Sequence, residues 1–424
     1  MTLISLKEYE TFPPRKKKYD SQDERVEKLK QISLDPQDIK LQEELQSREI
    51  LTINSNPYNN ELQFTTQSHV GVAQFSNFTV AITPKFSEIG KLVELIDYVY
   101  DLDLEIFTDS EIEFEGEQNI LSEIIISTFV KKCQKLIRQG LFKSYILRQD
   151  DVPFLRGKLL MPQQILNQAK IKLQFACEFD ELEYDNLENQ IILYCLKQSY
   201  KITINQERKS QIRKLIQNFS GMVSLKEISL DDFKKINYNQ MNHHYRKIHE
   251  LSKLIVNSMQ IFDFYKQNTR FVNSFFVNMN NIFEKFVFKL FYEFYEYPAK
   301  EQQHYPSWMT EKKGRKIDTI TDILIYEKNR SDVRTIIDTK YKPELTDNDR
   351  YQLAFYAHDY KKQEAYAILP EFTDSESDAF IATRQDVEIK IRHLNIDKAL
   401  GLISLRNTRE RNQKIQEMLD ELLN

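Results

Sequence analysis

The sequence predicts an α/β fold of the α+β kind, in which a β-rich N-terminal module and a helical connector precede a C-terminal mixed sheet flanked by helices. Short runs rich in Ile, Val, Thr and Tyr lie in both halves of the chain, as strands require. Longer stretches between them repeat apolar residues at helical spacing. The length of 424 residues suggests two or three domains.

Composition limits the classes of protein to which the chain can belong. Apolar residues make up 41% of the sequence, enough for sizeable cores, and 8 Gly and 11 Pro argue against long flexible linkers. With a net charge of −5, any nucleic-acid surface must gather its Lys and Arg locally. We find no signal-peptide segment, no apolar run of membrane-spanning length and no Walker-type phosphate loop. Cys133, Cys177 and Cys195 are scattered without paired spacing, which favours a reducing cytoplasm.

Residues 1–165 are predicted to form the β-rich module. The segments 69–75 and 78–85 alternate apolar and polar residues around a tight Ser76-Asn77 turn, which predicts a hairpin. Two helices and then two strands are expected at 88–100, 121–138, 141–148 and 154–161. No catalytic group of residues stands out here, so we interpret residues 1–165 as a partner-docking module.

Residues 166–424 are predicted to hold the connector and a catalytic domain. Two helical stretches, 186–219 and 239–268, carry apolar residues on one side and are expected to pack against the catalytic core. The core spans about residues 270–370, in the order helix, strand, strand, helix, strand. A charged helix is expected at about 408–423.

Two acidic residues and a lysine lie on neighbouring predicted strands of this core. Asp322 belongs to the first strand, whereas Asp338 and Lys340 belong to the second and share one face of it. Carboxylates among apolar neighbours are costly unless a cation compensates them. The three groups form the minimal set for metal-dependent phosphodiester hydrolysis, because the acids can hold Mg²⁺ and the lysine can orient water or neutralise charge. The alternative is a surface strand with an Asp–Lys ion pair.

The helices on either side offer two further polar groups. Glu284 is followed by apolar residues at i+3, i+4 and i+7, so it lies on an apolar stripe where a carboxylate needs a cation nearby. It is a candidate third acid, or else a glutamate at the edge of the stripe. Gln352, near the start of the next predicted helix, is a candidate for orienting water or a phosphate. The alternative for Gln352 is an ordinary polar position of an amphipathic helix.

Two basic clusters are candidates for contacts to a nucleic-acid backbone, which supply most sequence-independent affinity. Lys312, Lys313, Arg315 and Lys316 precede the first acidic strand. A second basic run lies at residues 15–18. A solvated loop and a solvated tail are the alternatives.

The spacing from Asp322 to Asp338-x-Lys340 resembles that of the PD-(D/E)XK nuclease superfamily, with Thr321 in place of the usual proline. The resemblance implies an endonuclease with Mg²⁺ as cofactor, for which Mn²⁺ could substitute. It implies that Asp322, Asp338 and Glu284 hold the metal. Lys340 and Gln352 would then be the remaining catalytic residues.

Several stretches, in their order along the chain, resemble the McrC family, the nuclease subunits of modification-dependent restriction systems. The stretches are Val70-Gly71-Val72, Ile82-Thr83-Pro84-Lys85, Phe179-Asp180-Glu181 with Asp185 and Asn189, Met279-Asn280 with Ile282-Phe283-Glu284, Asp338-Thr339-Lys340-Tyr341 and Tyr351-Gln352-Leu353 with Tyr356-Ala357. The likeness extends over about residues 68–370. Asn278 stands where the family usually has Asp.

The resemblance implies that the chain cuts double-stranded DNA together with a hexameric McrB-like AAA+ GTPase. The partner would read the modified base and hydrolyse GTP, and the N-terminal module would dock into its pore. A dimer formed through the nuclease domain is left open, and no membrane is involved. Two other functions stay open: a stand-alone repair nuclease or resolvase, and a non-catalytic AAA+ adaptor. The adaptor would lack one of the acids or the lysine, and none is missing.

Overall fold

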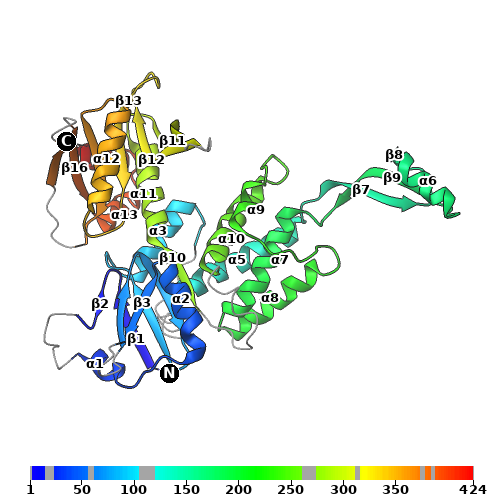
Figure 1. The fold of residues 1–424 in the computed structure, drawn as a ribbon, viewed down its shortest axis with the longest axis horizontal. Coiled ribbons are helices and arrows are strands. Elements are labelled where there is room, and N and C mark those ends of the chain that lie inside the picture. Colours follow the sequence, from blue (N-terminus) through cyan, green and yellow to red (C-terminus); the bar gives the residue numbers. More distant parts are fainter. Residues whose placement is uncertain are drawn as a thin grey trace. The chain divides into compact units, whose positions relative to one another are not determined.

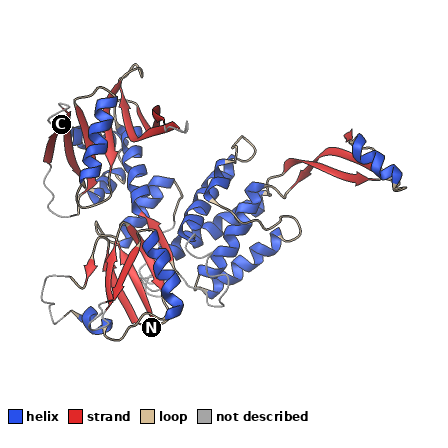
Figure 2. Cartoon of the chain, viewed as in Figure 1, coloured by secondary structure: helices blue, strands red, loops and turns tan. Residues whose placement is uncertain are grey.

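The computed structural model describes residues 2–14, 23–55, 62–104, 120–259, 274–310, 316–372, 378–382 and 387–423. The chain forms two compact units (Figure 1). The first combines Met1–Ile106 with Val272–Asn424, and the second is Phe107–Phe271. Each unit contains both helices and strands (Figure 2), which confirms the predicted α/β class of the α+β kind.

A four-stranded sheet organises the N-terminal part of the first unit. Its order is β1-β6-β5-β10, with bounds Thr2–Lys7, Phe78–Thr83, His69–Gln74 and Phe275–Asn278. β5 and β6 pair antiparallel around Ser76-Asn77, so the predicted hairpin is confirmed, and β1 joins β6 in parallel. β10 comes from the C-terminal half of the chain and pairs with β5, which the sequence did not reveal.

The pairing of β10 with β5 depends on Gly71. This residue lies opposite Phe276 and has a φ of +152°. A Cβ atom at this position would lie 1.9 Å from the carbonyl oxygen of Phe275, so any side chain would push the two strands apart. The glycine therefore lets the chain return to the N-terminal sheet immediately before helix α11 (Met279–Phe294) begins.

A small sheet and several helices complete the N-terminal part. The sheet has the order β2-β4-β3, with bounds Thr11–Phe12, Leu62–Thr66 and Leu51–Ser55. The helices are α1 (Glu24–Leu29), the 3-10 turn η1 (Pro36–Asp38), α2 (Ile39–Ser47) and α3 (Ile89–Tyr100). The buried carboxylate of Asp38 accepts hydrogen bonds from the Ser76 hydroxyl at 2.8 Å and the Ser76 amide at 3.1 Å. These bonds tie the start of α2 to the hairpin turn.

The C-terminal part of the first unit is built on a six-stranded mixed sheet. Its order is β11-β12-β13-β14-β16-β15, with bounds Ala299–Thr310, Lys316–Tyr326, Val333–Thr339, Glu364–Pro370, Val387–Leu394 and Asp378–Ala382. β12 and β13 are antiparallel, whereas β13, β14 and β16 run parallel. The accompanying helices are α11, α12 (Asp347–Asp359), α13 (Ile396–Ile403) and α14 (Thr408–Leu423).

The predicted order of the core over residues 270–370 is present, with two added strands, β10 before α11 and β11 after it. β11 lies between α11 and β12 and was not expected, because its sequence contains four charged or amide residues and Pro306 and lacks clear alternation. The predicted terminal helix at 408–423 is confirmed as α14.

Apolar packing holds α12 against one face of this sheet. Leu324 of β12, Ile336 of β13 and Ala367 of β14 are fully buried in one cluster. Leu353 and Ala357 of α12 complete it, and both are fully buried. Side chains two residues apart share a face of a strand. The packed face therefore continues to the side chain two residues after Ile336 on β13 and to the side chain two residues before Leu324 on β12.

The second unit is a set of helices from which a two-stranded ribbon extends (Figure 1). The helices are α5 (Ile120–Gln139), α7 (Leu187–Ile202), α8 (Gln206–Phe219), α9 (Leu230–Lys234), the 3-10 turn η2 (His243–Tyr245) and α10 (Arg246–Met259). The ribbon pairs β7 (Ser144–Val152) with β9 (Phe175–Glu183) along their whole length, and β8 (Lys158–Leu159) and α6 (Met161–Ala169) lie at its far end. The three cysteines are buried free thiols.

The two units do not coincide with the predicted division at residue 165. That position lies inside α6, between strands that pair with each other. The physical reason is the long-range pairing of β10 with β5, which joins the N-terminal sheet to the C-terminal half. Local patterns in the sequence carry no information about such a pairing. The docking role assigned to residues 1–165 stays a prediction.

Candidate active site

The register of β12 and β13 brings the two predicted strand acids together. Leu324 lies opposite Ile336, so two residues further along Asp322 lies opposite Asp338 on the same face. The Lys340 ammonium lies 2.6 Å from Oδ2 of Asp338 and 3.9 Å from Oδ2 of Asp322. The structure therefore gathers all three side chains at the end of the packed face beneath α12.

Asp338 is the most deeply buried acid of the group. Its side chain is 0% exposed, and within the described residues neither carboxylate oxygen has an aligned hydrogen-bond donor. Burial, and then the charge of Asp322, raises the pKa of Asp338 to about 7, although the Lys340 ammonium opposes this rise. Burial alone would lower the pKa of Lys340, but the charges of Asp338 and Asp322 raise it, so the lysine stays protonated.

Asp322 is held by a residue that the sequence analysis did not single out. Its Oδ2 atom accepts a hydrogen bond from the backbone amide of Thr339 at 2.8 Å and another from the Thr339 hydroxyl at 3.1 Å. Thr339 is the last residue of β13 and sits between Asp338 and Lys340, so one short segment provides three of the groups around the site. Thr339 occupies the unspecified position of the Asp-x-Lys pattern, so the pattern gave no indication that this residue would donate hydrogen bonds to Asp322.

Glu284 of α11 lies close enough to feel the charges of the strand residues. Burial, followed by the charge of Asp322, raises its pKa, and Lys340 opposes the rise. The exposed Gln302 of β11 donates a hydrogen bond to Oε1 of Glu284 at 3.2 Å. Across the described ranges, no three acidic, imidazole or thiol groups already stand at metal-ligand spacing. Glu284 is thus beside the Asp322–Asp338 pair without forming a preassembled triad with it.

Gln352 is tied to the sheet through a tyrosine. Its amide nitrogen donates to the Tyr356 hydroxyl at 2.6 Å, and that hydroxyl donates to the carbonyl oxygen of Ile320 at 2.7 Å. The charges of Asp338 and Asp322 contribute, after burial, to a raised pKa of Tyr356, so this pair of residues lies within electrostatic reach of the site. The proposed contact of Gln352 with water or phosphate stays a prediction.

The chain between β13 and α12 is fixed by a helix cap. The Thr346 amide donates to Oδ2 of Asp349 at 2.7 Å, and the side chains of Thr346 and Asp349 form a capping box at the start of α12. The Lys342 ammonium forms an ion pair with the same carboxylate. Lys342 lies two residues after Lys340, so this cap links the position of α12, and hence of Gln352, to the end of β13.

The predicted nucleic-acid contacts lie mostly outside the described residues. This holds for the basic run at 15–18 and for Lys312, Lys313 and Arg315. Lys316 begins β12, but its side chain is not among those described. These contacts stay predictions.

A second feature of functional interest is the far end of the ribbon. It exposes large apolar side chains, with Phe154 80% and Leu173 93% exposed. Others that are more than half exposed are Leu155, Ile165 and Ile171. Large exposed apolar side chains that gather at one end of an element are typical of an interaction site. The sequence analysis named no docking residue, because apolar residues in a predicted strand or helix look like core residues until the fold shows that they are exposed.

The sequence matches, over residues 64–370, the family described as "McrBC 5-methylcytosine restriction system component". No curated protein matches the chain. None of the helices within the described ranges combines the length and apolar character that crossing a bilayer requires.

Two solved structures from Thermococcus gammatolerans are similar to the chain. The first is the refined half-complex from a tetradecameric assembly of McrB AAA+ hexamers with bound McrC. It has 19% sequence identity and a TM-score of 0.54, and the match covers 99% of this chain and 100% of that chain. The second is the cryo-EM structure of the McrBC complex, with 23% identity, a TM-score of 0.43 and coverage of 69% and 88%. The first likeness shows a shared fold.

Proposed function

The chain belongs to the McrBC family of restriction-system components, and from this premise we propose that it is the DNA endonuclease subunit of a modification-dependent restriction system. The observation that carries the proposal is the meeting of Asp322, Asp338 and Lys340 on adjacent strands. A buried carboxylate without aligned donors, beside a second carboxylate and an ammonium, supports metal-dependent hydrolysis of a phosphodiester better than it supports a structural ion pair.

The donor set suits Mg²⁺, which prefers hard oxygen ligands. Asp322 and Asp338 would hold the ion, with Glu284 as the third acid. When bound, Mg²⁺ supplies Lewis-acid stabilisation of charge on the phosphate and could be replaced by Mn²⁺. A cation at this position would also compensate the Asp338 carboxylate, whose burial otherwise favours the neutral form.

The chain's own groups then act on the attacking water and the phosphate. Lys340 keeps its proton, so its ammonium can orient the water or neutralise charge that develops on the phosphate oxygens. Gln352, positioned by Tyr356, would hydrogen-bond to the water or to a phosphate oxygen. The water oxygen adds to phosphorus as the bond to one sugar oxygen breaks, which leaves one phosphate end and one hydroxyl end.

The apolar end of the ribbon is the surface that we assign to an McrB-type AAA+ GTPase hexamer. The solved structure with the same fold is of McrB hexamers with bound McrC. Phe154, Leu155 and Leu173 present apolar area on a narrow projection, which fits insertion into a partner more readily than it fits contact with a charged DNA backbone. The partner would recognise the modified base and hydrolyse GTP, and this chain would stimulate that hydrolysis and cut double-stranded DNA.

Cleavage by an Asp338→Asn variant tests the assignment. The substitution keeps the size of the side chain and removes the charge that would hold the metal. We expect wild-type chain, mixed with the McrB-type subunit of the same genome, GTP and Mg²⁺, to cut 5-methylcytosine-containing plasmid, and Asp338→Asn to leave it intact. The matched control is Asp332→Asn, an exposed acid in the turn between β12 and β13. Cutting by Asp338→Asn at the wild-type rate would refute the proposal.

The same experiment separates the two rival functions. A stand-alone repair nuclease or resolvase would cut at the same rate without the partner and GTP. A non-catalytic adaptor would raise the partner's GTPase rate but show no cleavage that depends on Asp338.

A further inference from the structure

A buried glutamate links the N-terminal sheet to the segment after β13 that carries Lys340. Glu8 follows β1 directly and is 0% exposed. Its Oε2 atom accepts hydrogen bonds from the Tyr341 hydroxyl at 2.7 Å and the Lys85 amide at 3.0 Å. Tyr341 is the residue after Lys340. A carboxylate is thus buried where two segments more than 330 residues apart in sequence meet.

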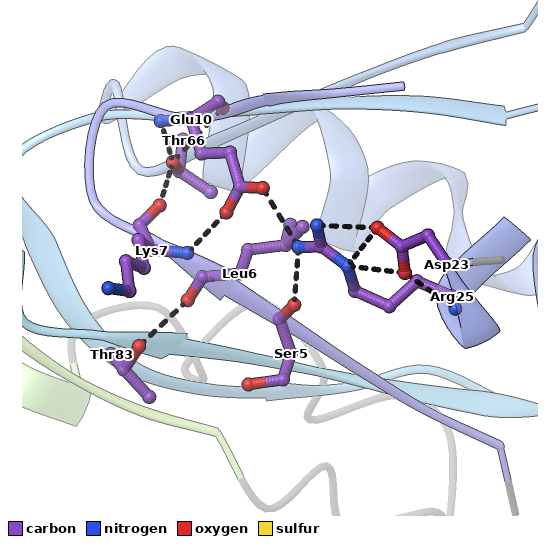
Figure 3. Close-up of polar contacts among 8 residues, drawn as sticks. All are labelled: Ser5, Leu6, Lys7, Glu10, Asp23, Arg25, Thr66 and Thr83. Atoms are coloured by element: carbon purple, nitrogen blue, oxygen red, sulfur yellow. Dashed lines mark hydrogen bonds and ion pairs between the residues drawn. The ribbon is translucent and has the colours of Figure 1, made fainter. Parts of the chain in front are cut away.

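The turn that presents Glu8 is held firmly on its own sheet (Figure 3). The Thr66 hydroxyl donates to the carbonyl oxygen of Lys7 at 2.6 Å, and the Lys7 amide donates to the carboxylate of Glu10 at 2.7 Å. Arg25 forms an ion pair with the same Glu10 carboxylate at 2.8 Å. These contacts on both sides of Glu8 leave its backbone little freedom to follow Tyr341 if the latter moved.

Tyr9 adds a second contact from the same turn. Its φ is +54°, a left-handed conformation that bulky residues rarely adopt. In this conformation its hydroxyl donates to the carbonyl oxygen of Tyr341. Glu8 and Tyr9 therefore hold both the side chain and the main chain of Tyr341. A strained backbone at such a point is maintained only where surrounding contacts enforce it.

Tyr341 also touches the element that carries Glu284. Its side chain is among the largest that are fully buried, at 1% exposure, and its ring centroid lies 5.6 Å from that of Phe283, the residue before Glu284. The ring of Phe372, which follows β14, lies 5.3 Å away on another side. The Lys340 amide donates to the carbonyl oxygen of Ile368 at 3.0 Å. One tyrosine is thus packed against the segments around the site.

We infer that Glu8 is a positioning residue of the nuclease site: through its hydrogen bond to Tyr341 it fixes the end of β13 so that the Lys340 ammonium stays between Asp338 and Asp322. The role rests on the nuclease function proposed above. It makes the N-terminal sheet part of the cutting apparatus, in addition to any docking role. Because the contact is a hydrogen bond to one oxygen, an amide at position 8 serves as acceptor, whereas a hydrocarbon of similar size does not.

Single-turnover cleavage of plasmid by the full chain with its McrB-type partner, GTP and saturating Mg²⁺ tests the role. Glu8→Leu and Tyr341→Phe each lower the rate constant by about tenfold or more, as small displacements of a catalytic group do. The rate constant of Glu8→Gln stays within about threefold of the wild-type value. The double variant Glu8→Leu/Tyr341→Phe is no slower than the slower single variant, because both substitutions remove the same hydrogen bond. Loss of folded protein lowers the amplitude of the reaction and leaves its rate constant unchanged.

The matched control is Asp38→Leu, which removes another buried carboxylate from the same part of the chain. The hydrogen bonds described above join Asp38 to the hairpin turn at Ser76. Asp38→Leu lowers thermal stability but keeps the wild-type rate constant. A wild-type rate constant for Glu8→Leu, or rates for the double variant that equal the product of the two single effects, would overturn the inference.

Hydrogen exchange gives a readout that does not depend on cleavage. In Glu8→Leu, without DNA or metal, a peptide covering residues 337–342 exchanges about tenfold faster than in wild type and in Asp38→Leu. Equal protection in all three proteins would contradict the role of Glu8 even if the chain cut no DNA. Cleavage by Asp338→Asn at the wild-type rate, by contrast, would overturn the nuclease function and leave the exchange result standing.

Discussion

Charged and apolar side chains are arranged in opposite ways in the proposed nuclease site and in the ribbon of the second unit. At the site, Asp338 is buried, and burial raises its pKa to about 7. On the ribbon, carboxylates are partly exposed and basic neighbours lower their pKa: Arg148 does so for Glu183, and Lys172 for Asp151. Apolar side chains are packed beneath the site, whereas the far end of the ribbon leaves them in solvent.

This contrast separates two kinds of function. At the site two carboxylates share one ammonium, so a negative charge there remains costly until a further cation compensates it, and the site indicates chemistry. Charges that are already paired near solvent need no further cation to compensate them. Exposed apolar area, by contrast, indicates a protein partner. Each of the following predictions changes one region and asks whether the other is affected.

The largest effect is expected at Lys340. Lys340→Met removes the ammonium near both acids while retaining much of the side-chain volume, so the single-turnover cleavage rate should fall by about 10³-fold. Binding to the partner and stimulation of its GTPase should be unchanged, because the ribbon is untouched. A cleavage rate within about tenfold of wild type would remove Lys340 from the catalytic set.

A smaller effect, confined to binding, is expected from the ribbon. Phe154→Ser combined with Leu173→Ser should weaken binding to the McrB-type partner by about 10²-fold, since buried apolar anchors dominate most interfaces. The control is Tyr292→Ser, which removes an apolar side chain of the first unit that is 67% exposed. Titration calorimetry of each variant against the partner measures the difference. Equal affinity of the ribbon variant and the control would show that the ribbon is not the docking surface.

Gln352→Ala should lower the cleavage rate by about tenfold, because the amide can contribute one hydrogen bond to water or phosphate. Tyr356→Phe should have a similar effect if the tyrosine positions the amide, since it removes the hydroxyl to which Gln352 donates. Single-turnover rates of the two single variants and the double variant test this link. Additive losses would mean that the two residues act separately.

The smallest effect concerns the pH dependence of stability. Burial raises the pKa of Glu8 from 4.5 to about 8, so the folded protein binds the proton more tightly than the unfolded chain. This contribution to stability is complete below about pH 4.5 and is lost as the pH rises through about 8. The unfolding temperature of wild type should therefore fall relative to Glu8→Gln between pH 5 and pH 9. A difference that stays constant over this range would contradict the raised pKa.

The sequence predicted the local parts of the site better than its surroundings. Alternation along a strand was enough to place Asp338 and Lys340 on one face, and the structure brings Asp322 to the same face. The chemical roles of these residues stay predictions. The turn residues at Ser76-Asn77 likewise revealed their hairpin, because both its strands are short and adjacent in sequence.

The parts that could not be predicted depend on contacts between distant segments. Nothing near Glu8 indicates that Tyr341 will lie beside it, and nothing near Gly71 indicates that β10 will approach. The exposure of Phe154 could not be foreseen either, since a phenylalanine next to a predicted strand is usually buried. In each case the missing information was which distant segment covers the residue, or that no segment does.

The most direct test of the account is a crystal structure of the chain grown with Mn²⁺ and measured at a wavelength that gives anomalous scattering from manganese. The account predicts one strong anomalous peak between Asp322 and Asp338, within bonding distance of carboxylate oxygens of both, and no such peak in Asp338→Asn. A map in which manganese binds elsewhere, while Lys340 still bridges the two carboxylates, would contradict the central claim.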